Sequence, residues 1–277
     1  MKKRIITSVV LIIIIGAAFY ATTEVSWVMD LIMYLLSVLA IYECLKVMNL
    51  LRLKLLSVIC FAYPTAVSVL IMIQRGDWIF DCAIGLVISL MFLAVLYRSS
   101  DRAKFTAAAL AGLFTFYITT GFSALTQLQK QQQPKAGAVL AAVIILGTWA
   151  GDVGGWLFGI TMGKHKLCPA ISPKKTVEGL FGSLILSEAA FVGLALLFRL
   201  VLPEQPLNWV VFACIAPFAA LFGLMGDLTA SVLKREYHVK DYGTIIAGHG
   251  GIMDRFDGVL MTSIMFLLAS RFLNFFD

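Results

Sequence analysis

Long apolar runs separated by short polar connections follow one another along the whole chain. A run of about 20 apolar residues is enough to cross the hydrocarbon core of a bilayer. On this criterion the sequence predicts nine membrane-spanning helices, near residues 5–21, 27–48, 55–74, 79–97, 104–126, 137–160, 177–200, 208–232 and 254–275. We therefore expect an all-α fold, in a polytopic integral membrane protein.

Polar residues are distributed unevenly between the two parts of the chain. Residues 1–136 carry few polar side chains beyond the ends of the predicted helices, which favours a lipid-facing scaffold. Residues 137–277 carry acidic, basic and glycine-rich segments in and around the last predicted spans, which favours a catalytic region with cytoplasmic loops. The longest polar connection, 236–253, is too short for a soluble domain, so the chemistry is expected at the membrane.

Composition and charge support this interpretation and give it a direction. The chain is 60% hydrophobic and 14% charged, which lies outside the range of soluble domains. A net charge of +6 would suggest nucleic acid as the partner of a soluble protein, but here the positions of the charges matter more. With a cytoplasmic N-terminus, 17 of the 22 basic residues fall in cytoplasmic segments. This predicts a cytoplasmic site, an external C-terminus and no nucleic-acid partner.

Acidic residues within the predicted spans are the first candidates for chemistry, because ionisable groups are costly there and usually functional. The ones to explain are Asp152, Asp227, Asp254 and Asp257, which all lie at the ends of the last three spans that approach the cytoplasm. Helical periodicity puts Asp227 on one face with Ser231 and Lys234, and puts Asp254 and Asp257 on one face of the next helix. Two such faces could hold Mg²⁺, which prefers carboxylate oxygens. The alternative is that the aspartates cap helices or pair with nearby basic residues.

Two connections of this region are suited to phosphate groups. The connection between the two acidic faces contains Lys240, Asp241 and a glycine-rich stretch at 248–251, whose backbone amides could face an anion. An earlier connection, 164–179, carries four lysines and two prolines. Attraction to anionic lipid headgroups is the alternative explanation for those lysines. Ser172 and Glu178 would also suit the entry of the following helix.

Together these segments resemble the signature of the bacterial phosphatidate cytidylyltransferases, over roughly residues 145–277. The downstream block consists of Ser231, Lys234, Arg235, Lys240, Asp241, the glycine-rich stretch 248–251, Asp254, Arg255 and Asp257. The upstream block consists of Asp152, residues 163–167, Ser172, Pro173, Lys174, Lys175, Thr176, Glu178 and Gly179.

The resemblance implies an enzyme of the bacterial cytoplasmic membrane that joins CTP and phosphatidate. In that reaction a phosphatidate oxygen attacks the α-phosphorus of CTP, and CDP-diacylglycerol and pyrophosphate are formed. Enzymes of this family are commonly dimeric. The implied cofactor is Mg²⁺, with a second cation such as K⁺.

The resemblance also implies roles for individual residues. Asp227 and Asp254 are the expected metal ligands, with Asp257 and Asp241 as candidates for a second ion or an outer position. Cationic residues expected to neutralise the phosphates of CTP or pyrophosphate are Lys234, Arg235, Lys240 and Arg255. The remaining expected substrate contacts are Asp152, Ser172, Lys174, Lys175, Thr176, Glu178, Ser231, His249, Gly250 and Gly251. His249 could instead only order its loop.

Two other functions use similar features. A CTP-dependent lipid kinase, such as a polyprenol kinase, would use the same cytoplasmic charges but transfer the γ-phosphoryl group and release CDP. An ion-coupled transporter would also carry aspartates and glycine-rich helices within its spans. Against a transporter, the two parts of the chain show no evident repeat, and the polar residues gather at one predicted face.

Overall fold

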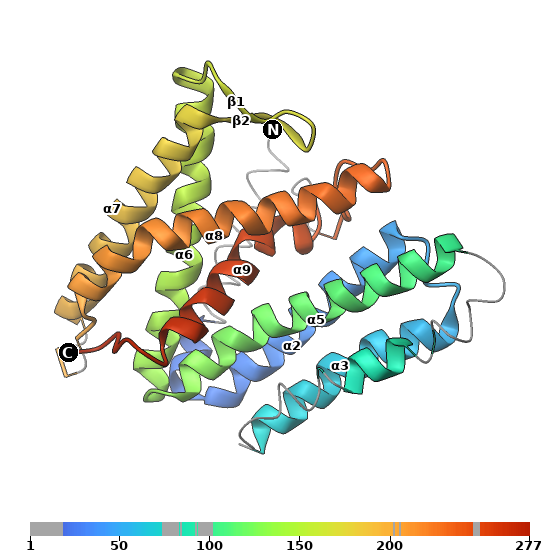
Figure 1. Cartoon of the computed structure of the whole chain (residues 1–277). Helices are drawn as coiled ribbons and strands as arrows, with labels where there is room; N and C mark the ends of the chain where they lie inside the picture. The colour runs from blue at the N-terminus through green and yellow to red at the C-terminus, as the bar shows by residue number, and fades with distance from the viewer. Residues whose placement is uncertain are drawn as a thin grey trace, which may run out of the picture.

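The computed structural model describes residues 19–73, 83, 85–91, 93, 102–201, 203–204, 206–245 and 250–277. These residues are mostly helical, as the hydrophobic pattern predicts (Figure 1). The helices are α2 (Ser26–Val47), α3 (Lys54–Met72), α5 (Arg102–Lys130), α6 (Pro134–Thr161), α7 (Val177–Val201), α8 (Trp209–Glu236) and α9 (Met253–Ala269).

Six helices of the described chain, all except α9 among those named above, are long and apolar enough to cross a membrane. Helices suit the interior of a membrane because each helix satisfies its own backbone hydrogen bonds. Most of the predicted spans 5–21 and 79–97 lies outside the described residues, so the count of nine stays a prediction. The bounds of the other predicted spans agree with the structure to within a few residues, except at the end of α9.

Helix α9 is shorter than predicted, with 17 residues ending at Ala269 instead of 275. After it the chain turns back toward the start of α8, where Asn208 donates a backbone hydrogen bond to the carbonyl of Phe275. The side chain of Phe275 packs against Phe212 and Phe266 in the core. The apolar residues after 269 are therefore buried by a returning tail, a pattern that hydropathy cannot distinguish from a longer helix.

A two-stranded hairpin corrects the all-α prediction. The basic connection after α6 forms β1 (Lys166–Cys168) and β2 (Ser172–Thr176), which pair antiparallel. Figure 1 shows this hairpin at one end of α6 and α7. Pro173 lies within β2, which is possible because every strand of a two-stranded ribbon is an edge strand, where proline is tolerated.

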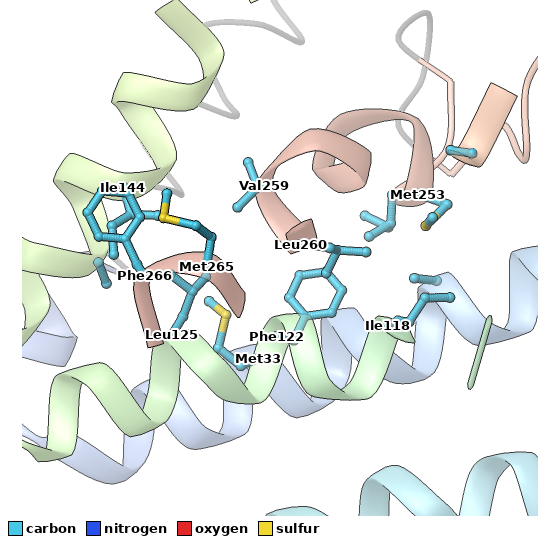
Figure 2. Packing of buried hydrophobic residues seen from close by; sticks show 14 of the residues in the cluster. Met33, Ile118, Phe122, Leu125, Ile144, Met253, Val259, Leu260, Met265 and Phe266 are labelled. Carbon is cyan, nitrogen blue, oxygen red and sulfur yellow. The ribbon is translucent and has the colours of Figure 1, made fainter. Parts of the chain in front are cut away.

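Helix α9 lies at the centre of the described helices. Figure 1 shows it between α8 on one side and the pair α2 and α5 on the other. In Figure 2, Leu260 and Phe266 of α9 meet Phe122 of α5 and Ile144 of α6, and all four are at most 1% exposed. One core cluster thus joins helices from before and after residue 136. The prediction that 1–136 is a scaffold and 137–277 catalytic is a functional division that this shared core does not test.

Candidate active site

The predicted acidic faces meet where α8 crosses α9. A Cβ atom added at Gly226 of α8 would lie 2.3 Å from the carbonyl oxygen of Asp257 in α9. A Cβ atom at Gly258, the next residue of α9, would lie 3.1 Å from the carbonyl oxygen of Gly223, which is about one turn before Gly226 in α8. The two helices therefore touch backbone to backbone, and Asp227, which follows Gly226, is brought near Asp257.

Carboxylates from three helices lie within electrostatic range of one another at this crossing. Asp257 of α9 interacts with Asp227 of α8 and with Asp152 of α6. The positive charge of Lys234 attracts the carboxylate of Asp257, and that of Lys175 attracts the carboxylate of Asp152. Asp257 is only 8% exposed, and its Oδ1 accepts the backbone N–H of Gly258 at 2.8 Å. Repulsion among the carboxylates is thus offset by two lysines in the structure as it stands.

The hairpin supplies one of those lysines. Lys175 of β2 forms an ion pair with Asp227, with 2.5 Å between Nζ and Oδ2. Ser231 donates to the other oxygen of Asp227 at 3.2 Å, which confirms that Asp227 and Ser231 share a helix face. A second link joins the hairpin to α8, because Nε of Arg235 donates to the carbonyl of Ile171 at 3.1 Å. The two motif blocks of the sequence are therefore in direct contact.

Asp254 is held by three donors of the protein. Its Oδ1 accepts from Nζ of Lys234 at 2.9 Å. Its Oδ2 accepts the backbone N–H groups of Tyr242 at 2.8 Å and Gly251 at 3.0 Å. The ion-pair alternative therefore describes Asp254 in this structure. A carboxylate has about four acceptor positions, so the expected role of Asp254 as a metal ligand stays a prediction.

Tyr242 is a site residue that the sequence analysis missed. Its hydroxyl donates to the carbonyl of Ala230 at 2.8 Å, and its ring lies 5.3 Å from Nζ of Lys234, within cation–π range. Burial raises the pKa of Tyr242 well above its usual range, so the phenol stays a hydrogen-bond donor. The presence of a tyrosine in an otherwise polar connection is the sequence feature that could have identified Tyr242.

The first turn of α9 is held by three further residues that the sequence analysis missed. Glu43 of α2 accepts the backbone N–H of Met253 at 3.0 Å. Trp149 of α6 donates through Nε1 to the carbonyl of Arg255 at 3.0 Å. Tyr117 of α5 donates to the carbonyl of Asp257, also at 3.0 Å. A glutamate inside a predicted span, as at Glu43, is the signal that could have identified this contact.

The base of the hairpin uses several residues that were expected to contact substrate. Glu178 accepts the backbone N–H of Lys164 at 3.0 Å, and its Oε1 lies 2.6 Å from Nδ1 of His165. Thr176 accepts the N–H of Gly179 at 3.0 Å, and Ser172 pairs with Cys168 across the hairpin. These contacts give the residues a role in shaping the hairpin, and contact with substrate stays a prediction.

The remaining predicted residues are more scattered. The side chains of Lys174, Lys240, Asp241 and Arg255 are exposed. Gly250 has a φ of +88°, a conformation that favours glycine. His249 lies outside the described residues. Within the described part of the chain, no group of three or more His, Cys, Asp or Glu side chains is arranged to hold a metal ion.

Comparison with known proteins covers nearly the whole chain. A profile of the Cytidylyltransferase family matches residues 2–273. A phosphatidate cytidylyltransferase of Staphylococcus haemolyticus is 34% identical over 272 residues, which cover 97% of this chain and 96% of that protein. One of Bacillus subtilis is 31% identical over 277 residues, covering 97% of this chain and 98% of the relative. The chain therefore belongs to the cytidylyltransferase family.

Proposed function

We propose that this protein is a phosphatidate cytidylyltransferase, which converts CTP and phosphatidate to CDP-diacylglycerol and pyrophosphate. Near full-length similarity to relatives of that name supports the reaction. The observation that carries the proposal in the structure is the contact between Lys175 and Asp227. It joins the two motif blocks into one charged site that is suited to anionic substrates.

The acidic residues at the helix crossing suit Mg²⁺ by their chemistry. Mg²⁺ is usually bound by one or two carboxylates, with substrate phosphates and water completing the octahedron. We propose Asp227 and Asp257 as the carboxylate pair, because they flank the backbone contact between α8 and α9. Asp254 would fix Lys234 and the adjoining connection, and remains a candidate third ligand. A second cation such as K⁺ is also proposed, with Asp241 as a candidate for its ligand or for an outer position.

When bound, the metal would neutralise charge on the reacting phosphates. The residues of the chain would do the rest by position and charge. A phosphatidate oxygen is already anionic near neutral pH, so its attack on the α-phosphorus needs no strong general base. Lys175 and Lys234 would hold phosphate groups beside the carboxylates, with Lys174 and Arg235 at the more exposed side. Catalysis of this kind consists of alignment and electrostatic stabilisation.

The proposal includes an orientation in the membrane. The hairpin, the end of α8 and the start of α9 belong to one end of the bundle, and the distribution of basic residues favours the cytoplasm for that end. We propose nine spans, a cytoplasmic N-terminus and a location in a cytoplasmic (inner) membrane. A homodimer is proposed on the family resemblance alone.

Purified protein incubated with Mg²⁺, phosphatidate and CTP labelled at the α-phosphate tests the reaction. Labelled lipid together with unlabelled pyrophosphate is the expected result. Labelled CDP together with an unlabelled phosphorylated lipid would instead identify a kinase, and no nucleotide chemistry with any lipid acceptor would count against both enzymes. The comparisons favour neither the kinase nor the transporter.

A further inference from the structure

Glu43 is a buried carboxylate in the part of the chain that was expected to be scaffold. It lies near the end of α2 and is 1% exposed. Its Oε2 accepts the N–H of Met253, whereas its Oε1 has no hydrogen-bond partner among the described residues. Burial of a carboxylate with an unsatisfied oxygen is unfavourable. Its presence in a hydrophobic bundle therefore needs an explanation beyond packing.

The surroundings of Glu43 supply one. A Cβ atom added at Gly243 would lie 2.4 Å from Oε1 of Glu43. A Cβ atom added at Gly251 would lie 2.4 Å from Oε2. The carboxylate is thus in close contact with the backbone at two separate points of the connection between α8 and α9. Larger residues at either point would overlap with it.

Glu43 also serves the start of α9. The first amides of a helix lack partners within the helix, and here the N-cap residue Ile252 makes no side-chain cap. The carboxylate of Glu43 accepts one of these amides from another helix, and negative charge is favourable at a helix N-terminus. The residue after Met253 is Asp254, whose Oδ2 holds Tyr242 and Gly251 of the same connection. Glu43 and Asp254 therefore fix the same backbone from two sides.

We infer that Glu43 is a positioning residue for the active site. By fixing the connection and the start of α9, it sets the position of Asp254 and Asp257 in α9 relative to Asp227 and Lys234 in α8. Glu43 itself touches no substrate. The inference rests on the proposed function in one respect, since it assumes that Asp254 and Asp257 serve the reaction.

The kinetic test compares Glu43→Ala and Glu43→Gln with Glu24→Gln, a control at an exposed glutamate. A shift of about 1 Å in a positioned group can cost on the order of 100-fold in rate. We expect Glu43→Ala to lower kcat at least tenfold and to raise the Mg²⁺ concentration for half-maximal activity. Glu43→Gln keeps an oxygen that can accept the N–H of Met253, so its kcat and its Mg²⁺ requirement should be closer to those of the wild type. A mere loss of folded enzyme would leave the Mg²⁺ requirement unchanged. Wild-type kcat and Mg²⁺ requirement in Glu43→Ala would overturn the inference.

A second test needs no activity. Gly251→Ala places a methyl group against the carboxylate, so it should lower the thermal unfolding temperature of the native protein clearly. In a Glu43→Ala background the same change should cost little, because the obstacle is gone. The four proteins form a double-mutant cycle. If Glu43→Ala does not fold, Glu43→Asp takes its place in that cycle, because the shorter side chain withdraws the carboxylate by one methylene. The control is Gly193→Ala, where an added Cβ atom meets nothing within 4 Å.

The two tests separate this inference from the proposed function. Additive effects of Gly251→Ala and the change at Glu43 would overturn the positioning contact, even if Asp257 proves essential. A non-additive cycle together with full activity of both Asp254→Asn and Asp257→Asn would instead overturn the proposed site and leave the contact established.

Discussion

Gly226 of α8 faces the backbone of Asp257 in α9 so closely that a Cβ atom at position 226 would lie 2.3 Å from the Asp257 carbonyl oxygen. That same carbonyl accepts the hydroxyl of Tyr117 from α5. The obstacle at this crossing is therefore fixed main chain, which cannot move aside as a flexible side chain can. The separation between Asp227 and Asp257 depends on the absence of a side chain at 226.

Substitution of Gly226 by alanine should force α8 and α9 apart. Overpacking of this kind typically costs about 1–3 kcal/mol of unfolding free energy. We expect a lower unfolding temperature and a loss of at least about tenfold in kcat, because two proposed metal ligands are displaced. Gly193→Ala, with open space around the new methyl group, should match the wild type in both measurements. A Gly226→Ala protein with wild-type activity and stability would contradict this prediction, because it would show that close contact between α8 and α9 is not required.

The proposed carboxylate pair predicts different outcomes for three aspartates. Asp227→Asn and Asp257→Asn should each lower kcat on the order of 100-fold, as expected when a preorganised electrostatic partner is removed. Both should change the Mg²⁺ dependence, with little change in unfolding temperature. Magnesium titrations of both variants, with Glu24→Gln as control, measure this. Normal turnover and Mg²⁺ dependence in both would exclude the pair as ligands.

Asp254→Asn should act mainly on stability. Lys234 and Asp254 are 11% and 7% exposed at their side chains, and removal of one partner leaves a buried charge uncompensated. The expected cost is about 3–5 kcal/mol of unfolding free energy. Asp254→Asn combined with Lys234→Met removes both charges and should recover part of that loss. If Asp254→Asn unfolds like the wild type but loses its Mg²⁺ dependence, Asp254 is a ligand instead of a loop anchor.

Adjacent lysines of the hairpin should behave differently. Lys175 pairs with Asp227, whereas Lys174 is exposed. Loss of a charged hydrogen bond costs about 1.5–3 kcal/mol, which corresponds to roughly 10- to 150-fold in rate. We expect Lys175→Ala to lower kcat within that range, and Lys174→Ala chiefly to raise KM for CTP or phosphatidate. Wild-type kinetics in the double variant would leave the hairpin as a headgroup anchor only.

Cysteine labelling checks the orientation. In a background without the native cysteines, Lys174→Cys and Lys240→Cys should react with an impermeant maleimide only from the cytoplasmic side. Glu204→Cys, in the connection before α8, should react only from outside. All three native side chains are exposed in the folded chain. External labelling at 174 or 240 would reverse the proposed topology.

Hydrophobic pattern was sufficient to predict most of the helices, because a bilayer allows apolar segments few other structures. It also brought Asp227 and Ser231 to one face, which the structure confirms. It could not show that the chain after Ala269 turns back, because buried tail and helix have the same composition. The hairpin was missed for a related reason, since its strands are too short and too polar to show a period.

Contacts of the candidate site could be predicted where its residues lie close in sequence, as for Asp227 and Ser231, and not where they lie far apart. Motif spacing identified Asp257 and Lys175, but spacing says nothing about which partner each charge meets. The contact of Glu43 with Met253 joins residues 210 positions apart, so a glutamate inside a predicted span marks Glu43 as unusual but does not indicate its partner. The hydrogen bonds of Trp149 and Tyr117 to α9 are equally hard to predict, because an aromatic residue in a membrane span usually only packs against its neighbours.

The position of α9 in the chain has a consequence for biogenesis. Glu43, Lys234 and the hydroxyl of Tyr117 all find partners in α9 or in the turn before it, and a ribosome makes these segments after every other described helix. Until α9 enters the bundle, a carboxylate and an ammonium group remain without the contacts that compensate their burial, at a cost of several kcal/mol each. Nascent chains that lack α9 therefore carry polar groups without the partners that they have in the complete protein.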